Sequence, residues 1–198
     1  MSASAALVRR ALDGHVAPGQ PVVLAGLSMG GYVAEAFARD YTSELAALVL
    51  LDTRSTADPA DARANRIKIA DESETSGTSD AVIGMSSGTL SATNAQERPE
   101  LVEQMRQMIE SQPGSGVAWS QRAMASRPDS GEVLANLDIP ALILVGEDDH
   151  VSPVDVMTDI AGSMKHATLR IIPDAGHMTP VEQPDLVAAA INQFLHTL

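Results

Sequence analysis

The stretch Gly26-Leu27-Ser28-Met29-Gly30-Gly31 lies between a short apolar run, Pro21 to Ala25, and a segment with apolar side chains at helical spacing, Gly31 to Tyr41. A serine flanked by glycines between a buried strand and a helix can occupy a sharp turn that presents its hydroxyl at the carboxyl edge of a sheet. We expect side chains at the glycine positions to strike the strand and the helix. The stretch therefore predicts Ser28 as a nucleophile and the N–H of Met29 as an oxyanion donor. The alternative is a glycine-rich turn whose serine only caps the helix.

Three more apolar runs have the composition of buried strands: Ala46 to Asp52, Pro140 to Val145, and Ala167 to Pro173. They are rich in Val, Ile and Leu without polar alternation, which is typical of strands buried on both faces of a parallel sheet. The segments with helical spacing are Ser4 to Asp13, Gly31 to Tyr41, Pro153 to Met164 with a Ser152 cap, and Pro184 to Leu198. Strands that alternate with helices predict an α/β fold with a parallel sheet and right-handed crossovers.

Residues 53–139 interrupt this alternation, because a crossover needs only about 10 to 12 residues. Helical spacing recurs at Pro59 to Asp71, Pro99 to Gln112 and Val117 to Arg127, and we expect the Ser-, Thr- and Gly-rich Ser73 to Asn94 to be flexible. The prediction is a core domain of residues 1–52 and 140–198 with a helical cap insertion of residues 53–139. Such an insertion is typical of a lid over a site, the alternative being a solvated helical decoration.

A serine hydroxyl needs a base, and the position of His177 favours it among the histidines. His177 follows the last apolar run, so it should lie at the carboxyl edge of the sheet together with Ser28. His15, His166 and His196 lie in turns or at the C-terminal helix end and are most simply solvated residues, and His150 is a loop neighbour of the acidic residues before it.

The third member of such a site is a carboxylate that orients the imidazole. The loop after the third apolar run contains Glu147-Asp148-Asp149 at the same edge. We favour Asp149, because it directly precedes the turn into the helix after Ser152. Asp148 is the main alternative, and Asp52 at the end of the second run is a minor one.

Three motifs in the order Ser, Asp, His resemble the α/β-hydrolase superfamily. They are G-L-S-M-G-G at Gly26 to Gly31, P-x-L-x-x-x-G-x-x-D-x-x-x-P at Pro140 to Pro153, and G-H-x-x-x-x-E-x-P at Gly176 to Pro184. The first motif and Leu51-Asp52-Thr53-Arg54 look like the branch of small-molecule esterases, lactone hydrolases and enol-lactonases. The resemblance implies an α/β-hydrolase-type sheet.

The resemblance also assigns roles to individual residues. By the family pattern Ser28 is the nucleophile, Asp149 the acid, His177 the base and Met29 an oxyanion donor. The implied activity is cleavage of small carboxylic esters or lactones through an acyl-enzyme intermediate. The alternatives are a truncated, catalytically weak member, and the same three residues used for perhydrolysis, carbon–carbon bond hydrolysis or thioester hydrolysis. An apolar acyl pocket under the lid would be lined by Met85, Met108, Trp119 and Met124; the alternative is that these side chains simply pack the cap helices.

The sequence departs from the family pattern before Ser28, where 27 residues hold one helix and one strand. Family members have about four strands and two helices there, so we expect about four strands in all, without the usual N-terminal ones. The run Pro21 to Ala25 should then be an exposed edge that pairs in a homo-oligomer, is rearranged, or marks the chain as part of a longer reading frame. The family's second oxyanion donor, from a His-Gly-type loop, is not encoded, which predicts activity reduced by about 10²- to 10³-fold.

Composition narrows the function classes. The 198 residues carry a formal charge of −13, contain no cysteine and are 44% hydrophobic. An acidic chain argues against nucleic acid and anionic membranes as partners, and the missing thiols exclude thiolate chemistry. There is no apolar run of about 18 residues and no secretory signal pattern, so we expect a cytoplasmic protein. We also expect no metal or organic cofactor, because no ligand cluster stands out.

Overall fold

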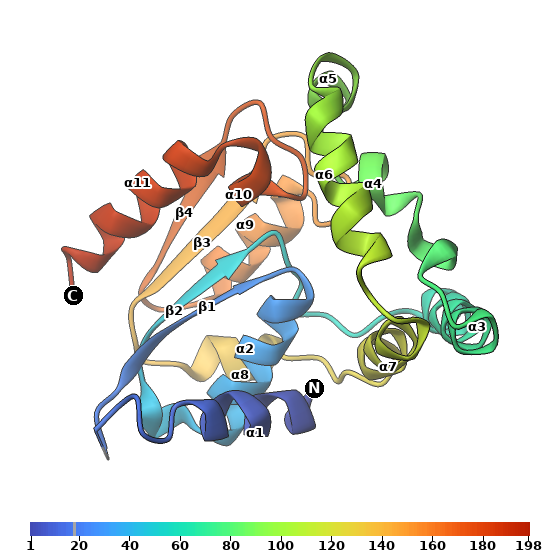
Figure 1. The fold of residues 1–198 in the computed structure, drawn as a ribbon. Coiled ribbons are helices and arrows are strands. Elements are labelled where there is room, and N and C mark those ends of the chain that lie inside the picture. The colour runs from blue at the N-terminus through green and yellow to red at the C-terminus, as the bar shows by residue number, and fades with distance from the viewer. Residues whose placement is uncertain (18) are drawn as a thin grey trace.

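A parallel sheet in the order β1-β2-β3-β4 forms the centre of the computed structural model, which describes residues 1–17 and 19–198 (Figure 1). Its strands are β1 (Val22–Leu27), β2 (Leu45–Leu51), β3 (Ala141–Gly146) and β4 (Ala167–Ile172). The four predicted runs are confirmed, with small shifts at their ends. Because consecutive strands pair in parallel, their carboxyl ends all meet at one edge of the sheet.

Helices cover the two faces of the sheet unequally (Figure 1). Those along the sheet are α1 (Ser2–Ala11), α2 (Met29–Asp40), α8 (Gly131–Asn136), α9 (Val154–Ser163) and α11 (Pro184–Leu195). Helices α1, α2, α8 and α9 share one apolar core with the sheet, which includes the fully buried Phe37, Leu48 and Ile143. On the opposite face α11 packs over a smaller core that includes Val49 and Leu144.

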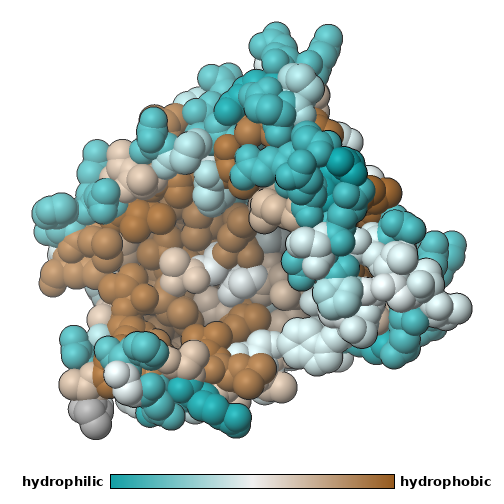
Figure 2. All heavy atoms as spheres, viewed as in Figure 1, coloured by the Kyte–Doolittle hydropathy of each residue, from teal (hydrophilic) through white to brown (hydrophobic). Residues whose placement is uncertain are grey.

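The strand β1 lies at the edge of the sheet, as expected from the short segment before it. Val22 and Leu24 face the larger core, while Val23 and Ala25 point to the other face and are exposed. Val23 keeps 37% of its surface accessible. Figure 2 shows the result, a broad apolar surface over the sheet between α11 and α1. The strand β1, whose composition is typical of a buried strand, therefore has one face and one edge uncovered in the described structure.

Residues 53–139 are largely helical, but α8 of this range packs into the larger core of the sheet, and the other helices form the insertion proper. The insertion contains α3 (Ala60–Ser76), η2 (Asp80–Val82), α4 (Met85–Gly88), α5 (Ala92–Glu97), α6 (Pro99–Glu110) and α7 (Gly114–Ala125). The described residues also form the short helices η1 (Thr42–Glu44) and α10 (Thr179–Glu182).

The segment Ser73 to Asn94, which we expected to be flexible, contains regular structure. Helix α3 continues to Ser76 and ends at Gly77 with φ 74°, and three short helical turns follow. Tertiary contacts hold this part in place, since Gly114 of α7 is packed so closely that a Cβ there would overlap the carbonyl of Ser73. The Ser91 hydroxyl also caps α5 by accepting the N–H of Asn94 at 3.1 Å.

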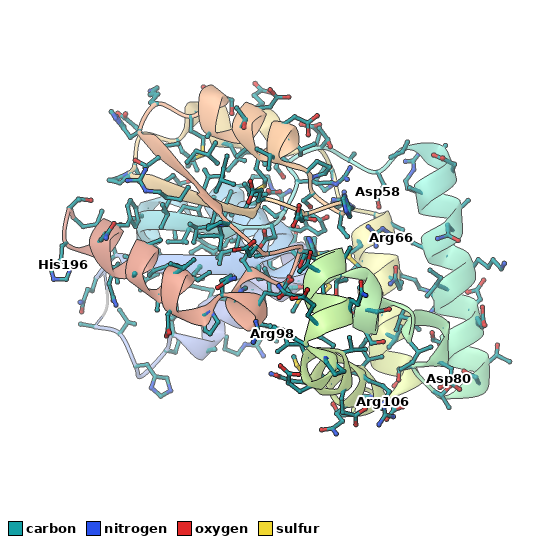
Figure 3. All side chains as sticks on the ribbon, turned by 90° about the horizontal axis from the view of Figure 1, so that it is seen from above. Asp58, Arg66, Asp80, Arg98, Arg106 and His196 are labelled. Atoms are coloured by element: carbon teal, nitrogen blue, oxygen red, sulfur yellow. The ribbon has the colours of Figure 1, made fainter. Side chains whose placement is uncertain are left out.

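A buried ion-pair network joins the insertion to helix α2. Asp58 accepts hydrogen bonds from Arg66 at 2.5 Å and from Arg127 at 2.7 Å, and Asp58 and Arg66 lie side by side in Figure 3. Burial raises the pKa of Asp58, but the two guanidinium groups outweigh it and the net pKa lies below its ordinary value. The Arg127 guanidinium also stacks 4.1 Å from the ring centre of Tyr32 in α2. Removing either arginine would leave the largely buried Asp58 carboxylate with only one of its two cationic partners.

None of the helices formed by residues 1–17 and 19–198 combines the length and the apolar character needed to cross a lipid bilayer.

Candidate active site

Ser28 occupies the sharp turn predicted between β1 and α2. Its backbone has φ 51° and ψ −113°, a region that non-glycine residues rarely adopt. Two hydrogen bonds hold it there: the N–H of Ser28 donates to Leu51 at 2.9 Å, and Thr53 Oγ1 donates to the Ser28 carbonyl at 2.8 Å. The strain is therefore compensated by contacts from the end of β2.

The glycines around Ser28 are not equivalent. A Cβ at Gly26 would overlap the backbone of Gly30, and a Cβ at Gly31 would overlap the side chain of Thr53. A Cβ at Gly30 would meet nothing within 4 Å. The expectation that every glycine of the motif is needed for space is thus wrong for Gly30, whose Cα faces open space at the start of the helix.

Ser28, His177 and Asp149 form a continuous hydrogen-bonded chain. Ser28 Oγ lies 2.7 Å from His177 Nε2, and His177 Nδ1 lies 2.9 Å from Asp149 Oδ2. His177 and Asp149 are buried, whereas Ser28 is half-buried and stands at the open end. The structure brings these three predicted residues together at the carboxyl edge of the sheet, from the ends of β1, β3 and β4.

The loop after β3 fixes the carboxylate of Asp149. Its Oδ1 accepts the N–H of Val151 at 2.7 Å and of Ser152 at 2.8 Å, which leaves Oδ2 for His177. Burial raises the pKa of Asp149, but the hydrogen bond and charge of His177 and the two backbone donors outweigh it, so the net pKa is lowered. A carboxylate with a lowered pKa stays ionised at neutral pH and can stabilise an imidazolium.

The helix after this loop begins differently from the prediction. Pro153 is the N-cap of α9, no side chain caps the helix, and the buried Ser152 hydroxyl has no hydrogen-bond partner among the described residues. The carboxylate of Asp149, three residues before Ser152, accepts the hydrogen bonds of the loop N–H groups instead.

The other acids and histidines lie elsewhere. Asp148 is exposed, and the carboxylate of Asp52 accepts hydrogen bonds from Gly146 and Thr179 rather than from His177. His15 and His150 are exposed, and His166 lies 3.1 Å from Asp138 on the surface. His196 bonds the carbonyl of Asn192 at the far end of α11, well away from the insertion (Figure 3).

Met29 is the first residue of α2 and is half-buried. The N–H groups of the first helical turn have no acceptor within the helix. The N–H of Met29 is one of these groups, next to Ser28 at the positive end of the helix dipole, and its role as an oxyanion donor stays a prediction.

The four predicted pocket residues are dispersed over the insertion. Met85 and Trp119 share the lining of a cavity of about 340 Å³ between α4 and α7, but Ser28 does not line it. Met108 is 48% exposed on α6, and Met124 Sδ lies 3.3 Å from an Arg66 nitrogen. The four side chains thus do not form one pocket in the described structure.

A further carboxylate, Glu182, ties the insertion to the His177 loop. Its Oε1 accepts the N–H of Gly176 at 2.8 Å, and its Oε2 accepts the N–H of Ser91 and the Nδ2 of Asn94, both at 2.8 Å. The N–H of His177 itself donates to Thr89 at 2.9 Å. Glu182 is part of a motif in the sequence, but the motif alone gave it no role. Only the structure shows that its carboxylate is buried and that both oxygens accept hydrogen bonds.

The described residues contain no group of three or more His, Asp or Glu side chains arranged to hold a metal ion.

Comparison with known proteins gives consistent matches. The model of a family described as the alpha/beta hydrolase family matches residues 2–190. A solved structure of a thermophilic, malate-bound esterase from Thermogutta terrifontis is 41% identical, with a TM-score of 0.89 over 94% of this chain and 68% of that chain. An enol-lactonase from Burkholderia xenovorans LB400, at 20% identity and a TM-score of 0.82 over 97% of this chain and 71% of that chain, is similar in fold alone.

A curated relative from Bacillus subtilis (strain 168) is 30% identical over 187 residues, which are 89% of this chain. It is provisionally named as a 2-succinyl-6-hydroxy-2,4-cyclohexadiene-1-carboxylate synthase. The chain spans 66% of the length of that relative.

Proposed function

The chain belongs to the alpha/beta hydrolase family, and from this premise we propose that it is a serine hydrolase that cleaves small carboxylic esters or lactones. The observation that carries the proposal is the chain of hydrogen bonds from Ser28 Oγ through His177 to Asp149, at 2.7 and 2.9 Å. A hydroxyl, a buried imidazole and an ionised carboxylate in this order are the parts needed for nucleophilic catalysis by serine.

The proposed reaction has two halves. Ser28 Oγ attacks the carbonyl carbon while its proton passes to His177 Nε2, and the N–H of Met29 donates to the developing oxyanion. The ester C–O bond then breaks, and the leaving oxygen takes the proton from His177. In the second half His177 removes a proton from water as the water oxygen attacks the acyl carbon. The C–O bond to Ser28 then breaks, and Ser28 Oγ takes that proton back from His177. Asp149 keeps Nδ1 protonated throughout and stabilises the imidazolium.

The substrate class rests on the relatives together with the surface charge. The malate-bound esterase is 41% identical, so carboxylic esters are the first substrates to test. A formal charge of −13 disfavours strongly anionic esters, because a surface of that sign repels them at low ionic strength.

A second candidate reaction is favoured by one observation, the 30% identity to the synthase of Bacillus subtilis. In that case the same three residues would act on a cyclohexadiene carboxylate precursor rather than on an ester. Esters remain the first choice because the esterase shares more sequence with this chain.

Replacing Ser28 tests the proposal. We expect Ser28→Ala to lower kcat for short-chain nitrophenyl esters or a lactone panel by at least about 10³-fold. A fluorophosphonate probe should label the native protein and leave Ser28→Ala unlabelled. The matched control is Ser126→Ala, an exposed serine at the end of α7, which should keep both activity and labelling. Equal ester turnover in Ser28→Ala and the native protein would remove Ser28 from the mechanism, and an unlabelled but folded native protein would contradict the proposal as a whole.

A further inference from the structure

Two consecutive residues at the end of β2, Asp52 and Thr53, are fully buried directly beneath the proposed site. Neither has a role in the chemical steps described above. Burying a carboxyl group costs free energy unless its oxygens accept hydrogen bonds. The hydrogen-bond partners of Asp52 and Thr53 therefore indicate what the two residues do.

Thr53 contacts the turn that carries Ser28. Its Oγ1 donates to the Ser28 carbonyl at 2.8 Å, and its side chain fills the space that a Cβ at Gly31 would need. The strained backbone of Ser28 is thus supported from the end of the neighbouring strand.

Asp52 contacts the other two loops. Its Oδ1 accepts the N–H of Gly146 at 2.9 Å, at the end of β3 and three residues before Asp149. Its Oδ2 accepts the hydroxyl of Thr179 at 2.5 Å, two residues after His177. The backbone of Asp52 has φ 47°, a left-handed conformation that aspartate tolerates better than most residues.

The strand order explains why residues at the end of β2 can contact the loops that carry Ser28, Asp149 and His177. Strand β2 lies between β1 and β3, so its carboxyl end is flanked by the turn after β1 and the loop after β3. Turning Asp52 into the left-handed region allows its carboxyl to reach Gly146 and Thr179, while Thr53 contacts Ser28.

We propose that Asp52 and Thr53 are positioning residues, which together set the distances between the loops of Ser28, Asp149 and His177. The inference deepens the proposed hydrolase function and rests on it. Asp52 acts through its hydrogen bonds to Gly146 and Thr179, and Thr53 acts through its bond to the Ser28 carbonyl. An error of about 1 Å in such a site can cost about 100-fold in rate.

Burial raises the pKa of Asp52 to about 7, although the hydrogen bonds from Thr179 and Gly146 and the charge of His177 act against it. A carboxyl with a pKa of about 7 is partly protonated at neutral pH, so its hydrogen bonds do not depend on a full negative charge. Asparagine can then replace it, since its Oδ1 accepts from Gly146 while its Nδ2 donates to the Thr179 hydroxyl, which can rotate.

The test uses pairs of variants that differ in one hydrogen bond. Thr179→Val removes the hydroxyl at nearly constant volume, and Thr179→Ser keeps it; Thr53→Val and Thr53→Ser form the same pair at the nucleophile turn. Asp52→Ala is compared with Asp52→Asn. For each variant kcat and KM are measured on a nitrophenyl ester, normalised to the amount of protein that a fluorophosphonate titrates, and the thermal midpoint is recorded.

We expect Thr179→Val, Thr53→Val and Asp52→Ala to lose about 10- to 100-fold in kcat with KM changed by less than about threefold. The matched Thr179→Ser, Thr53→Ser and Asp52→Asn variants should recover most of kcat. A role confined to stability would lower the thermal midpoint but leave kcat per titrated site unchanged, and that result overturns the inference. If Asp52→Ala does not fold, the two threonine pairs decide the outcome alone.

The Ser28→Ala control separates this inference from the proposed function. Should Ser28→Ala be inactive while the valine variants turn over at the native rate, the positioning role is wrong and the hydrolase function stands. Should Ser28→Ala keep native turnover, the proposed function itself is wrong.

Discussion

Three glycines near Ser28 look alike in the sequence but differ in what surrounds them. Gly26 and Gly31 are in tight contact with the backbone of Gly30 and the side chain of Thr53, and Gly30 faces open space. A sequence motif shows where glycine stands, but it does not show which neighbouring atoms would clash with a larger residue. The difference between Gly30 and the other two glycines therefore follows only from the structure.

This difference predicts that a glycine-to-alanine substitution changes the free energy of unfolding differently at the three positions. We expect Gly31→Ala and Gly26→Ala to lower the free energy of unfolding by about 1 to 3 kcal/mol or more, because the added methyl overlaps neighbouring atoms. Gly30→Ala should be neutral or stabilise by up to about 1 kcal/mol, since alanine is the better helix former. Urea unfolding of the three variants measures this, and a loss at Gly30 as large as at Gly26 would contradict it.

Glu35 in α2 is a buried acid that the proposed mechanism does not use. It is 2% exposed, and its Oε1 has no hydrogen-bond partner among the described residues. Burial raises its pKa from 4.5 to about 8, against the opposing effects of Ser130 and Arg127. The folded state therefore holds a proton that the unfolded state has lost between about pH 4.5 and 8, and stability falls as the pH rises through that range.

Replacing Glu35 by glutamine should remove this dependence. We expect Glu35→Gln to match the native protein near pH 5 and to exceed its free energy of unfolding at pH 8 by up to about 5 kcal/mol, at about 1.4 kcal/mol per unit of pKa shift. Urea titrations at both pH values measure the difference. Glu72→Gln, at an exposed position on α3, is the matched control and should show no pH-dependent gain. An identical pH dependence in Glu35→Gln and the native protein would contradict the assignment.

At the scale of single residues, the sequence placed Ser28, His177 and Asp149 together because each follows a predicted strand, and parallel strands end at one edge. It could not find Thr53 or Glu182, whose roles depend on hydrogen bonds across 25 and up to 91 residues of chain. Those partners become neighbours only once the insertion and the loops are folded.

At the scale of elements, the long periodic segments were predictable and the short ones were not. Helices α3, α6, α7 and α11 carry enough turns to show their spacing, whereas α4, α5, α8 and α10 have only four to six residues. Helices this short are not stable by propensity and depend on tertiary contacts. The Ser- and Thr-rich part of the insertion is accordingly held by contacts from α7 and Glu182 rather than by its own composition.

At the scale of the whole molecule, the uncovered edge and face of β1 predict self-association. We propose that copies of the chain pair through this surface, because an unpaired strand edge with apolar neighbours is a template for another strand. The formal charge of −13 opposes the approach of two copies, and salt screens that repulsion. Sedimentation velocity should therefore show an associated fraction that grows with protein concentration and with added salt.

A charge placed on the exposed face of β1 should reverse this. We expect Val23→Lys to shift the protein to the monomer, because the lysine must leave water when a second copy covers that apolar face. Leu7→Lys, at a 55% exposed position on α1, changes the net charge equally and serves as the control. Equal sedimentation of the native protein and Val23→Lys at every salt concentration would rule out pairing through β1.

The distance along the chain between the members of the proposed site has a kinetic consequence. Ser28 and His177 are 149 residues apart, and the parallel sheet between them contains no local strand pairing. Closing such long loops is slow, so helices should form well before these two side chains meet. During refolding, recovery of the far-ultraviolet circular dichroism should therefore precede recovery of fluorophosphonate labelling. Labelling of Ser28 would then report the moment in refolding when the ends of β1 and β4 come together.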